Sequence, residues 1–117
     1  MHRWTADERE LEAEDLRRAS EAAGGVPMSA CRDREDTCVA GTVRAVTVRT
    51  RAGAPSLEAD IYDGSGTVTL VFLGRKYIPG IEAGRSMKAS GRVTVQDRRT
   101  TIFNPRYELL PPARTST

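Results

Sequence analysis

The sequence is poor in aromatic residues and metal ligands, and it has no long apolar run. Aromatic residues make up 5% of 117 positions, and there are one histidine, His2, and two cysteines, Cys31 and Cys38. No run of eighteen apolar residues occurs, so no membrane-spanning helix is expected. The N-terminus carries acids and no apolar core, which argues against a signal peptide. We expect a cytoplasmic protein with no membrane partner.

The sequence lacks the residues that a metal site or a catalytic site would need. Structural zinc takes four Cys or His ligands, and the chain offers three, one of them His2. Cys31 and Cys38 are expected to be reduced thiols, although their spacing also permits a disulfide. No Gly-rich loop precedes Lys-Ser or Lys-Thr, and we interpret Asp60 and Asp63 as solvated strand and turn acids. We predict no metal, no cofactor and no enzyme activity.

Charge is unevenly distributed along the chain. Residues 1–36 hold six Lys and Arg against ten Asp and Glu, a balance of −4, and residues 37–117 hold twelve against six, a balance of +6. Sixteen of the eighteen cations are arginine, whose guanidinium can bind a phosphate at two points. A basic body behind an acidic leader favours an anionic partner.

The acidic leader is expected to contain one helix. Thr5-Ala6-Asp7-Glu8 has the form of a capping box, helix formers continue to Ala23, and Gly24-Gly25 ends the run. Its apolar face is thin and comprises Trp4, Leu11, Leu16, Ala19 and Ala23. Such a helix can pack on the following domain, mediate self-association, or fray. A polar connection over 25–36 completes the segment 1–36.

From Thr37 the apolar residues recur at every second position, which is typical of strands. The first strand is expected to bulge, because the face of Val39, Gly41 and Val43 continues at Val46 and Val48 after a one-residue slip. A basic loop over 49–55 follows. Residues 57–73 then predict a hairpin that turns at Asp63-Gly64-Ser65-Gly66. Its predicted core residues are Leu57, Ala59, Ile61, Val68, Leu70 and Phe72.

The remaining residues predict two more strands and a tail. An irregular piece over 74–84 has Tyr77, Ile78 and Ile81 as its apolar anchors, and strands over 86–96 and 100–103 flank a charged turn, with a loose continuation to Leu109. The all-β pattern of five curled strands indicates a small closed barrel over 37–110 with an N-terminal helix. Residues 111–117 are expected to be disordered.

Five short patterns occur in an order that resembles a known family. They are Val39-x-Gly41-x-Val43, Asp63-Gly64-x-Gly66-x-Val68-x-Leu70-x-Phe72-x-Gly74, Pro79-Gly80-Ile81-x-x-Gly84, Gly91-Arg92-Val93 and Asn104-Pro105-x-Tyr107-Glu108. Over residues 37–109 the chain resembles OB-fold nucleic-acid-binding domains, namely the wedge domain of RecG-like helicases, anticodon-binding domains and small stand-alone OB proteins of high-GC bacteria. The resemblance implies a five-stranded Greek-key OB barrel and a non-catalytic binding role.

The resemblance also predicts where a ligand binds. OB barrels bind single strands along their second and third strands, framed by two loops, which here are Arg49-Thr50-Arg51 and Asp97-Arg98-Arg99. We expect single-stranded DNA, or RNA, held by arginine-rich loops with limited stacking on an outward-facing Tyr62. The candidate residues are Arg44, Arg49, Arg51, Tyr62, Arg75, Lys76, Arg92, Arg98 and Arg99.

Two features of the strand face count against this docking. Glu58 and Asp60 flank Tyr62 and would repel phosphate, which leaves the loops as the better candidates. Phe72 and Phe103 are expected in the core, whereas Tyr107 is left open between a plug at the barrel end and a binding residue. The alternative function is a protein-interaction or assembly module that uses the helix, as a homodimer or with a protein partner.

Overall fold

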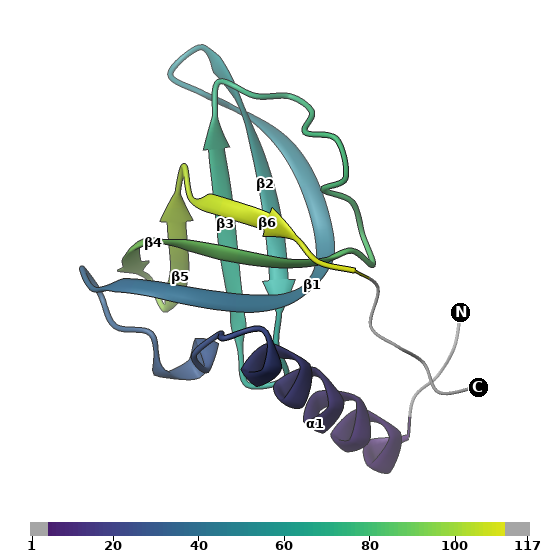
Figure 1. Cartoon of the computed structure of the whole chain (residues 1–117). Helices are drawn as coiled ribbons and strands as arrows, with labels where there is room; N and C mark the ends of the chain where they lie inside the picture. Colours follow the sequence, from purple (N-terminus) through teal and green to yellow (C-terminus); the bar gives the residue numbers. More distant parts are fainter. Residues whose placement is uncertain (1–4, 112–117) are drawn as a thin grey trace.

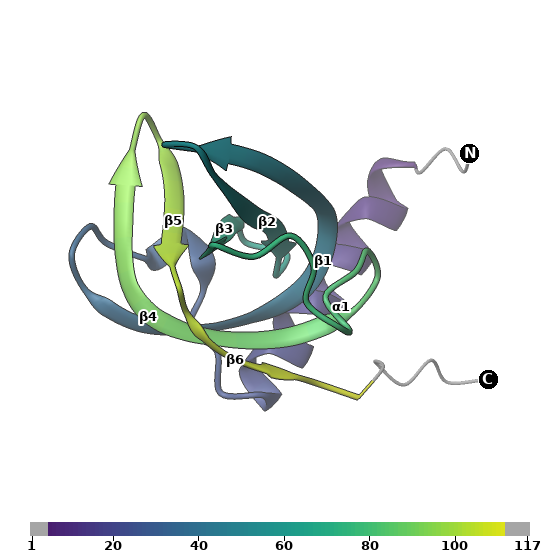
Figure 2. The ribbon, with the colours of Figure 1, turned by 90° about the horizontal axis from the view of Figure 1, so that it is seen from above.

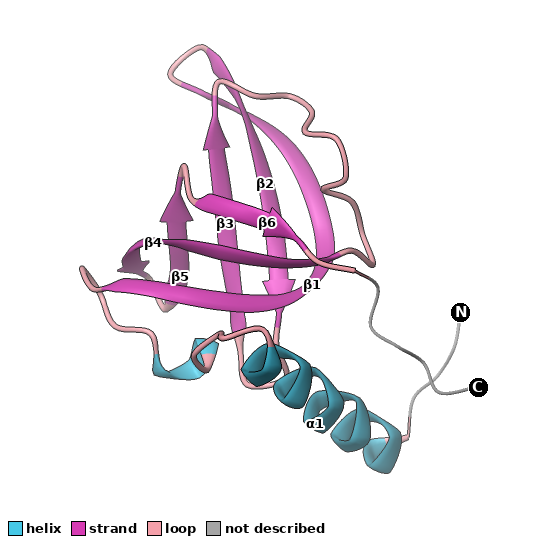
Figure 3. Ribbon diagram, in the orientation of Figure 1, coloured by secondary structure: helices cyan, strands magenta, loops and turns pink. Residues whose placement is uncertain are grey.

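The computed structural model describes residues 5–111, so Trp4, His2 and the tail over 112–117 lie outside the described residues. The described part contains one α-helix, one 3₁₀ turn and a six-stranded sheet (Figures 1 and 3). The elements are α1 (Ala6–Ala22), η1 (Met28–Ala30), β1 (Asp36–Arg51), β2 (Ala54–Tyr62), β3 (Thr67–Leu73), β4 (Ser86–Gln96), β5 (Arg99–Phe103) and β6 (Arg106–Leu109). No helix within 5–111 is long and apolar enough to cross a membrane.

Five strands close into a barrel, as predicted. The order is β1-β2-β3-β5-β4, and β1 also pairs with β4, so the strands form a ring when seen from above (Figure 2). All neighbours are antiparallel except β3 and β5, which run parallel over Thr69–Val71 and Thr101–Phe103. This parallel seam is short. β6 continues β5 after a break at Asn104, whose φ of 48° is the left-handed region that asparagine tolerates.

The predicted bulge lies in β1. The register with β2 shifts between Val43 and Ala45, which leaves Arg44 as an extra residue. The bend lets β1 pair with β4 over residues 36–42 and with β2 over residues 42–51. The predicted basic loop over 49–55 is wrong in its extent, because Arg49 and Arg51 belong to β1 and β2 begins at Ala54. The two strands meet in a tight turn instead.

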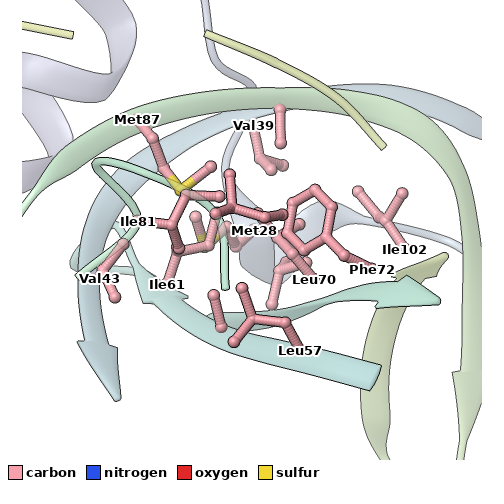
Figure 4. Close-up of a cluster of buried hydrophobic side chains, with 14 of the residues drawn as sticks. Met28, Val39, Val43, Leu57, Ile61, Leu70, Phe72, Ile81, Met87 and Ile102 are labelled. Carbon is pink, nitrogen blue, oxygen red and sulfur yellow. The ribbon is translucent and has the colours of Figure 1, made fainter. Parts of the chain in front are cut away.

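The core fills the barrel with the side chains that alternation predicted (Figure 4). All six core residues predicted in the hairpin are at most 5% exposed. Phe103 was expected there too and is 42% exposed, because Ile102 is the residue of β5 that points inward. Tyr77, expected as an anchor, is 71% exposed, whereas Ile78 and Ile81 are buried. Val48 lies opposite Leu57 on the predicted face but is 54% exposed.

The helix starts as predicted, but only part of its predicted apolar face is covered, since Leu16 and Ala23 are half-buried and Ala19 is exposed. The Thr5 side chain accepts a hydrogen bond from the Glu8 amide at 3.1 Å. Leu11, expected on the apolar face, is 61% exposed. The contact with the β2–β3 turn is close: a Cβ on Gly64, whose φ is +91°, would lie 2.1 Å from the Ala13 carbonyl oxygen. Only glycine is compatible with both the conformation and this approach.

Asp63 connects α1, η1 and the hairpin turn, and it corrects the interpretation of this residue as a solvated acid. Its side chain is 0% exposed. One carboxylate oxygen accepts from Arg17 Nη1 at 2.7 Å and from the Met28 amide at 2.9 Å. The other accepts from the amides of Ser65 at 2.8 Å and Gly66 at 3.1 Å. The helix is therefore attached to the barrel through a buried ion pair.

The cysteines are free thiols. Cys31 Sγ lies 3.9 Å from Thr37 Oγ1, and Cys38 is the next residue of β1, so its side chain points to the other side of the strand. Burial raises the pKa of the Cys31 thiol, which favours its unreactive protonated form. Within residues 5–111, no group of three or more His, Cys, Asp or Glu side chains is arranged to hold a metal ion.

Candidate nucleic-acid interface

Two adjoining hollows lie along the outer face of β2 and β3. The basic hollow, about 390 Å³, is lined by Arg51, Glu58, Thr69, Val71, Thr94, Gln96, Asp97, Arg99, Thr101 and Phe103. The helix hollow, about 510 Å³, is lined by Arg9, Glu12, Arg44, Asp60, Tyr62 and Thr67. The Thr69 hydroxyl in the basic hollow donates to Asp60 Oδ1 in the helix hollow at 2.7 Å. This contact joins the walls of the two hollows, which we refer to together as the groove.

Three arginines converge on one buried carboxylate in the basic hollow. Arg51 Nη2 lies 2.8 Å from Glu58 Oε2. Arg49 Nε and Arg99 Nη2 lie 3.3 and 3.5 Å from Glu58 Oε1. Arg49 and Arg51 come from the end of β1 and Arg99 from the start of β5. The two arginine-containing segments predicted to frame the groove therefore meet at a single point.

The position of Glu58 changes the prediction that it repels phosphate. Its side chain is 4% exposed, whereas those of the three arginines are 44–56% exposed. Each guanidinium carries five N–H donors in a planar fork. The contacts with Glu58 use only part of them, so donors remain for solvent or a ligand. Glu58 lies beneath the arginines and fixes their side chains, while Asp97 is the exposed acid at the rim.

Phe103 was expected in the core and lies in the groove instead. Its ring is partly exposed in the basic hollow, and the Arg51 guanidinium carbon lies 5.7 Å from the ring centre. The alternation of side chains along β5 could have predicted this position, because Phe103 must point outward from the barrel if Ile102 points into the core. Tyr107, by contrast, packs edge-on against Phe72 with 5.5 Å between ring centres and lines neither hollow.

In the helix hollow an arginine lies on an aromatic ring. Tyr62 faces outward, as predicted, and its hydroxyl donates to the Gly64 carbonyl at 3.4 Å. The Arg44 guanidinium carbon lies 4.6 Å from the centre of the Tyr62 ring, within the range of cation–π contacts. Arg44 Nη2 also pairs with Glu12 of α1. The part played by α1 was not predicted, because nothing local in the sequence brings residues 9–12 to β2.

The other four predicted site residues line neither hollow. Arg75 and Lys76 are exposed in the β3–β4 connection. Arg92 is exposed on β4, where its register partner is Asp36 of β1. Arg98 is exposed in the β4–β5 turn with a φ of 64°. Of the predicted set, Arg44, Arg51, Tyr62 and Arg99 line the hollows. Arg49 lines neither hollow but reaches Glu58 of the basic hollow through an ion pair.

Comparison with known proteins agrees with this architecture. Residues 37–110 match the tRNA anticodon family model, described as an OB-fold nucleic acid binding domain. No curated protein matches the sequence. The matched range covers the barrel from Thr37, the second residue of β1, to the end of β6, and excludes α1. Since it spans more than half of the chain, the protein belongs to the family of OB-fold nucleic acid binding domains of the tRNA anticodon type.

Proposed function

We propose that the protein is a non-catalytic module that binds single-stranded nucleic acid, DNA or RNA, in the groove on β2 and β3. The observation that carries the proposal is the convergence of Arg49, Arg51 and Arg99 on the buried Glu58. Guanidiniums held in place lose less side-chain entropy when they bind a phosphate than freely moving ones do. The basic hollow would hold the sugar-phosphate backbone.

Aromatic side chains give the groove its preference for unpaired bases. Phe103 borders the basic hollow and Tyr62 the helix hollow. Stacking of a base on an aromatic ring contributes about 1–3 kcal/mol per base and tolerates any sequence. A duplex keeps its bases stacked on each other, so it cannot use these rings. We infer that DNA and RNA single strands bind better than duplexes of the same length.

Fluorescence anisotropy with labelled oligonucleotides tests the proposal. We expect single strands of about twelve nucleotides, oligothymidine and oligouridine, to bind more tightly than a matched duplex. If three phosphates are neutralised, the slope of log affinity against log salt should be about −2. Affinity then falls about 15-fold between about 50 and 200 mM salt. Absence of binding to any oligonucleotide at the lower salt would contradict the proposal and favour a protein-docking module, for which exposed Leu11 of α1 is a candidate contact.

The role of Glu58 gives a prediction with an unusual sign. Glu58→Gln removes a negative charge from the groove, yet we expect affinity for single strands to fall about three- to tenfold, because the three arginines lose the anion that positions them. Glu82→Gln, an exposed acid of the β3–β4 connection, is the matched control and should leave affinity unchanged. Tighter binding by the Glu58 variant would show that the carboxylate acts only by repulsion.

A further inference from the structure

We propose that the helix hollow is a subsite for one unpaired base, in which the guanidinium of Arg44 is the stacking platform and not a phosphate ligand. The inference rests on the proposed function and adds the ligand class of this second hollow. It also gives α1, which lies outside the matched range 37–110, a part in binding.

The position of Arg44 favours a flat contact. Arg44 is the extra residue of the β1 bulge, so it has no register partner on β2. Its guanidinium lies over the Tyr62 ring at 4.6 Å, and its side chain remains 49% exposed. One face of the guanidinium is therefore covered by the ring, and the side chain still reaches the open hollow. Guanidinium planes, like aromatic rings, stack on unpaired bases.

Glu12 holds the Arg44 guanidinium in place through a contact at the edge of its plane. Its carboxylate pairs with Arg44 Nη2 across the gap between α1 and β1, and its side chain is 29% exposed. This pair engages the edge of the guanidinium, through which an arginine would otherwise bind a phosphate. The hollow is also balanced in charge, since Arg9 and Arg44 face Glu12 and Asp60. A neutral base suits this environment better than a second phosphate does.

The walls suit a base in chemistry, and the hollow is large enough to admit one. The hollow of about 510 Å³ can accommodate one base beside the Arg44 platform. Asp60 uses one carboxylate oxygen to accept from the Thr69 hydroxyl and is 38% exposed, so it retains acceptor capacity toward the hollow. Carboxylates accept from exocyclic amines such as that of cytosine. The subsite should therefore favour cytosine over thymine when one base is varied in an oligothymidine.

Arg44→Lys separates the two roles of this residue. Lysine keeps the charge but has no planar face, so a stacking platform predicts a loss of about five- to tenfold in single-strand affinity with an unchanged salt slope. Arg92→Lys is the matched control, because Arg92 is exposed on β4 and lines neither hollow, and it should leave affinity unchanged. A second variant, Glu12→Gln, should also weaken binding although it removes an acid. Melting curves verify that each variant is folded.

The outcomes distinguish this inference from the proposed function. Wild-type affinity for Arg44→Lys, or a salt slope shallower by about 0.7 in Arg44→Ala, would identify Arg44 as a phosphate ligand and overturn the subsite, while the groove remained supported. Tighter binding by Glu12→Gln would overturn it too. An oligonucleotide with abasic sites at its centre should bind wild type and Arg44→Lys with equal affinity. If wild type binds no single strand at any salt, both proposals fail.

Discussion

Removing Arg51 and Arg99 together is expected to lower affinity for single-stranded oligonucleotides by about 30- to 100-fold at low salt. Each guanidinium can form charge-assisted contacts that contribute about 1–3 kcal/mol. Arg51 also lies over Phe103, so its loss removes a neighbour of that ring. The double alanine variant leaves Glu58 with Arg49 as its remaining partner among the contacts described above, which exposes the strand to an acid that the wild type neutralises.

Anisotropy titrations over a range of salt concentrations measure this loss. The salt slope should become shallower by about 1.4, since each phosphate contact on a single strand contributes about 0.7. An Arg32→Ala, Arg92→Ala variant removes the same charge from exposed positions that line neither hollow, and it should lose less than about threefold. Equal losses in the two variants would mean that overall charge, and not the groove, determines binding.

Replacing Asp63 with alanine is expected to produce the largest loss of stability, about 3–5 kcal/mol in the free energy of unfolding. The substitution leaves Arg17, 18% exposed, without its buried partner, and it removes the acceptor of the Met28 amide. It also removes the side chain that bonds the amides of Ser65 and Gly66 in the hairpin turn. Small domains are stable by only about 5–15 kcal/mol, so this is a large fraction of the total.

Urea denaturation followed by circular dichroism measures the change. Asp15→Ala is a suitable control, because Asp15 is a 74% exposed acid in an ion pair on the outer face of α1, and such pairs contribute at most about 1 kcal/mol. An Asp63 variant that unfolds within about 0.5 kcal/mol of wild type would show that the turn, the 3₁₀ segment and the helix are held by other contacts.

The parts of the fold that could be predicted from the sequence are those in which local alternation coincides with burial. The hairpin over 57–73 was predicted because every second residue is apolar and Gly64 and Gly66 mark the turn. The bulge in β1 was predicted because the apolar phase slips by one residue. Both signals come from neighbours in the chain, and the structure satisfies both.

The predictions that proved wrong concern residues whose contacts come from segments distant in the sequence. Glu58 and Asp63 follow an outward or turn pattern, yet both are buried, because arginines from β1, β5 and α1 reach them. The phase of its apolar neighbours predicted Phe103 in the core, but Ile102 is the inward residue of β5 and Phe103 lines the basic hollow. The pairing of α1 with the β2–β3 turn has no local signal, so the helix hollow could not be foreseen.

The short parallel seam between β3 and β5 has a consequence for the groove. It is the shortest of the pairings that close the barrel and joins Thr69–Val71 to Thr101–Phe103. The basic hollow lies across it, lined by Thr69 and Val71 from one strand and by Thr101 and Phe103 from the other. A nucleic acid bound there would contact both β3 and β5. Because a ligand stabilises the state that it binds, it would stabilise the pairing of these two strands. If the proposed ligand binds there, occupancy of the groove and closure of the barrel are thermodynamically linked.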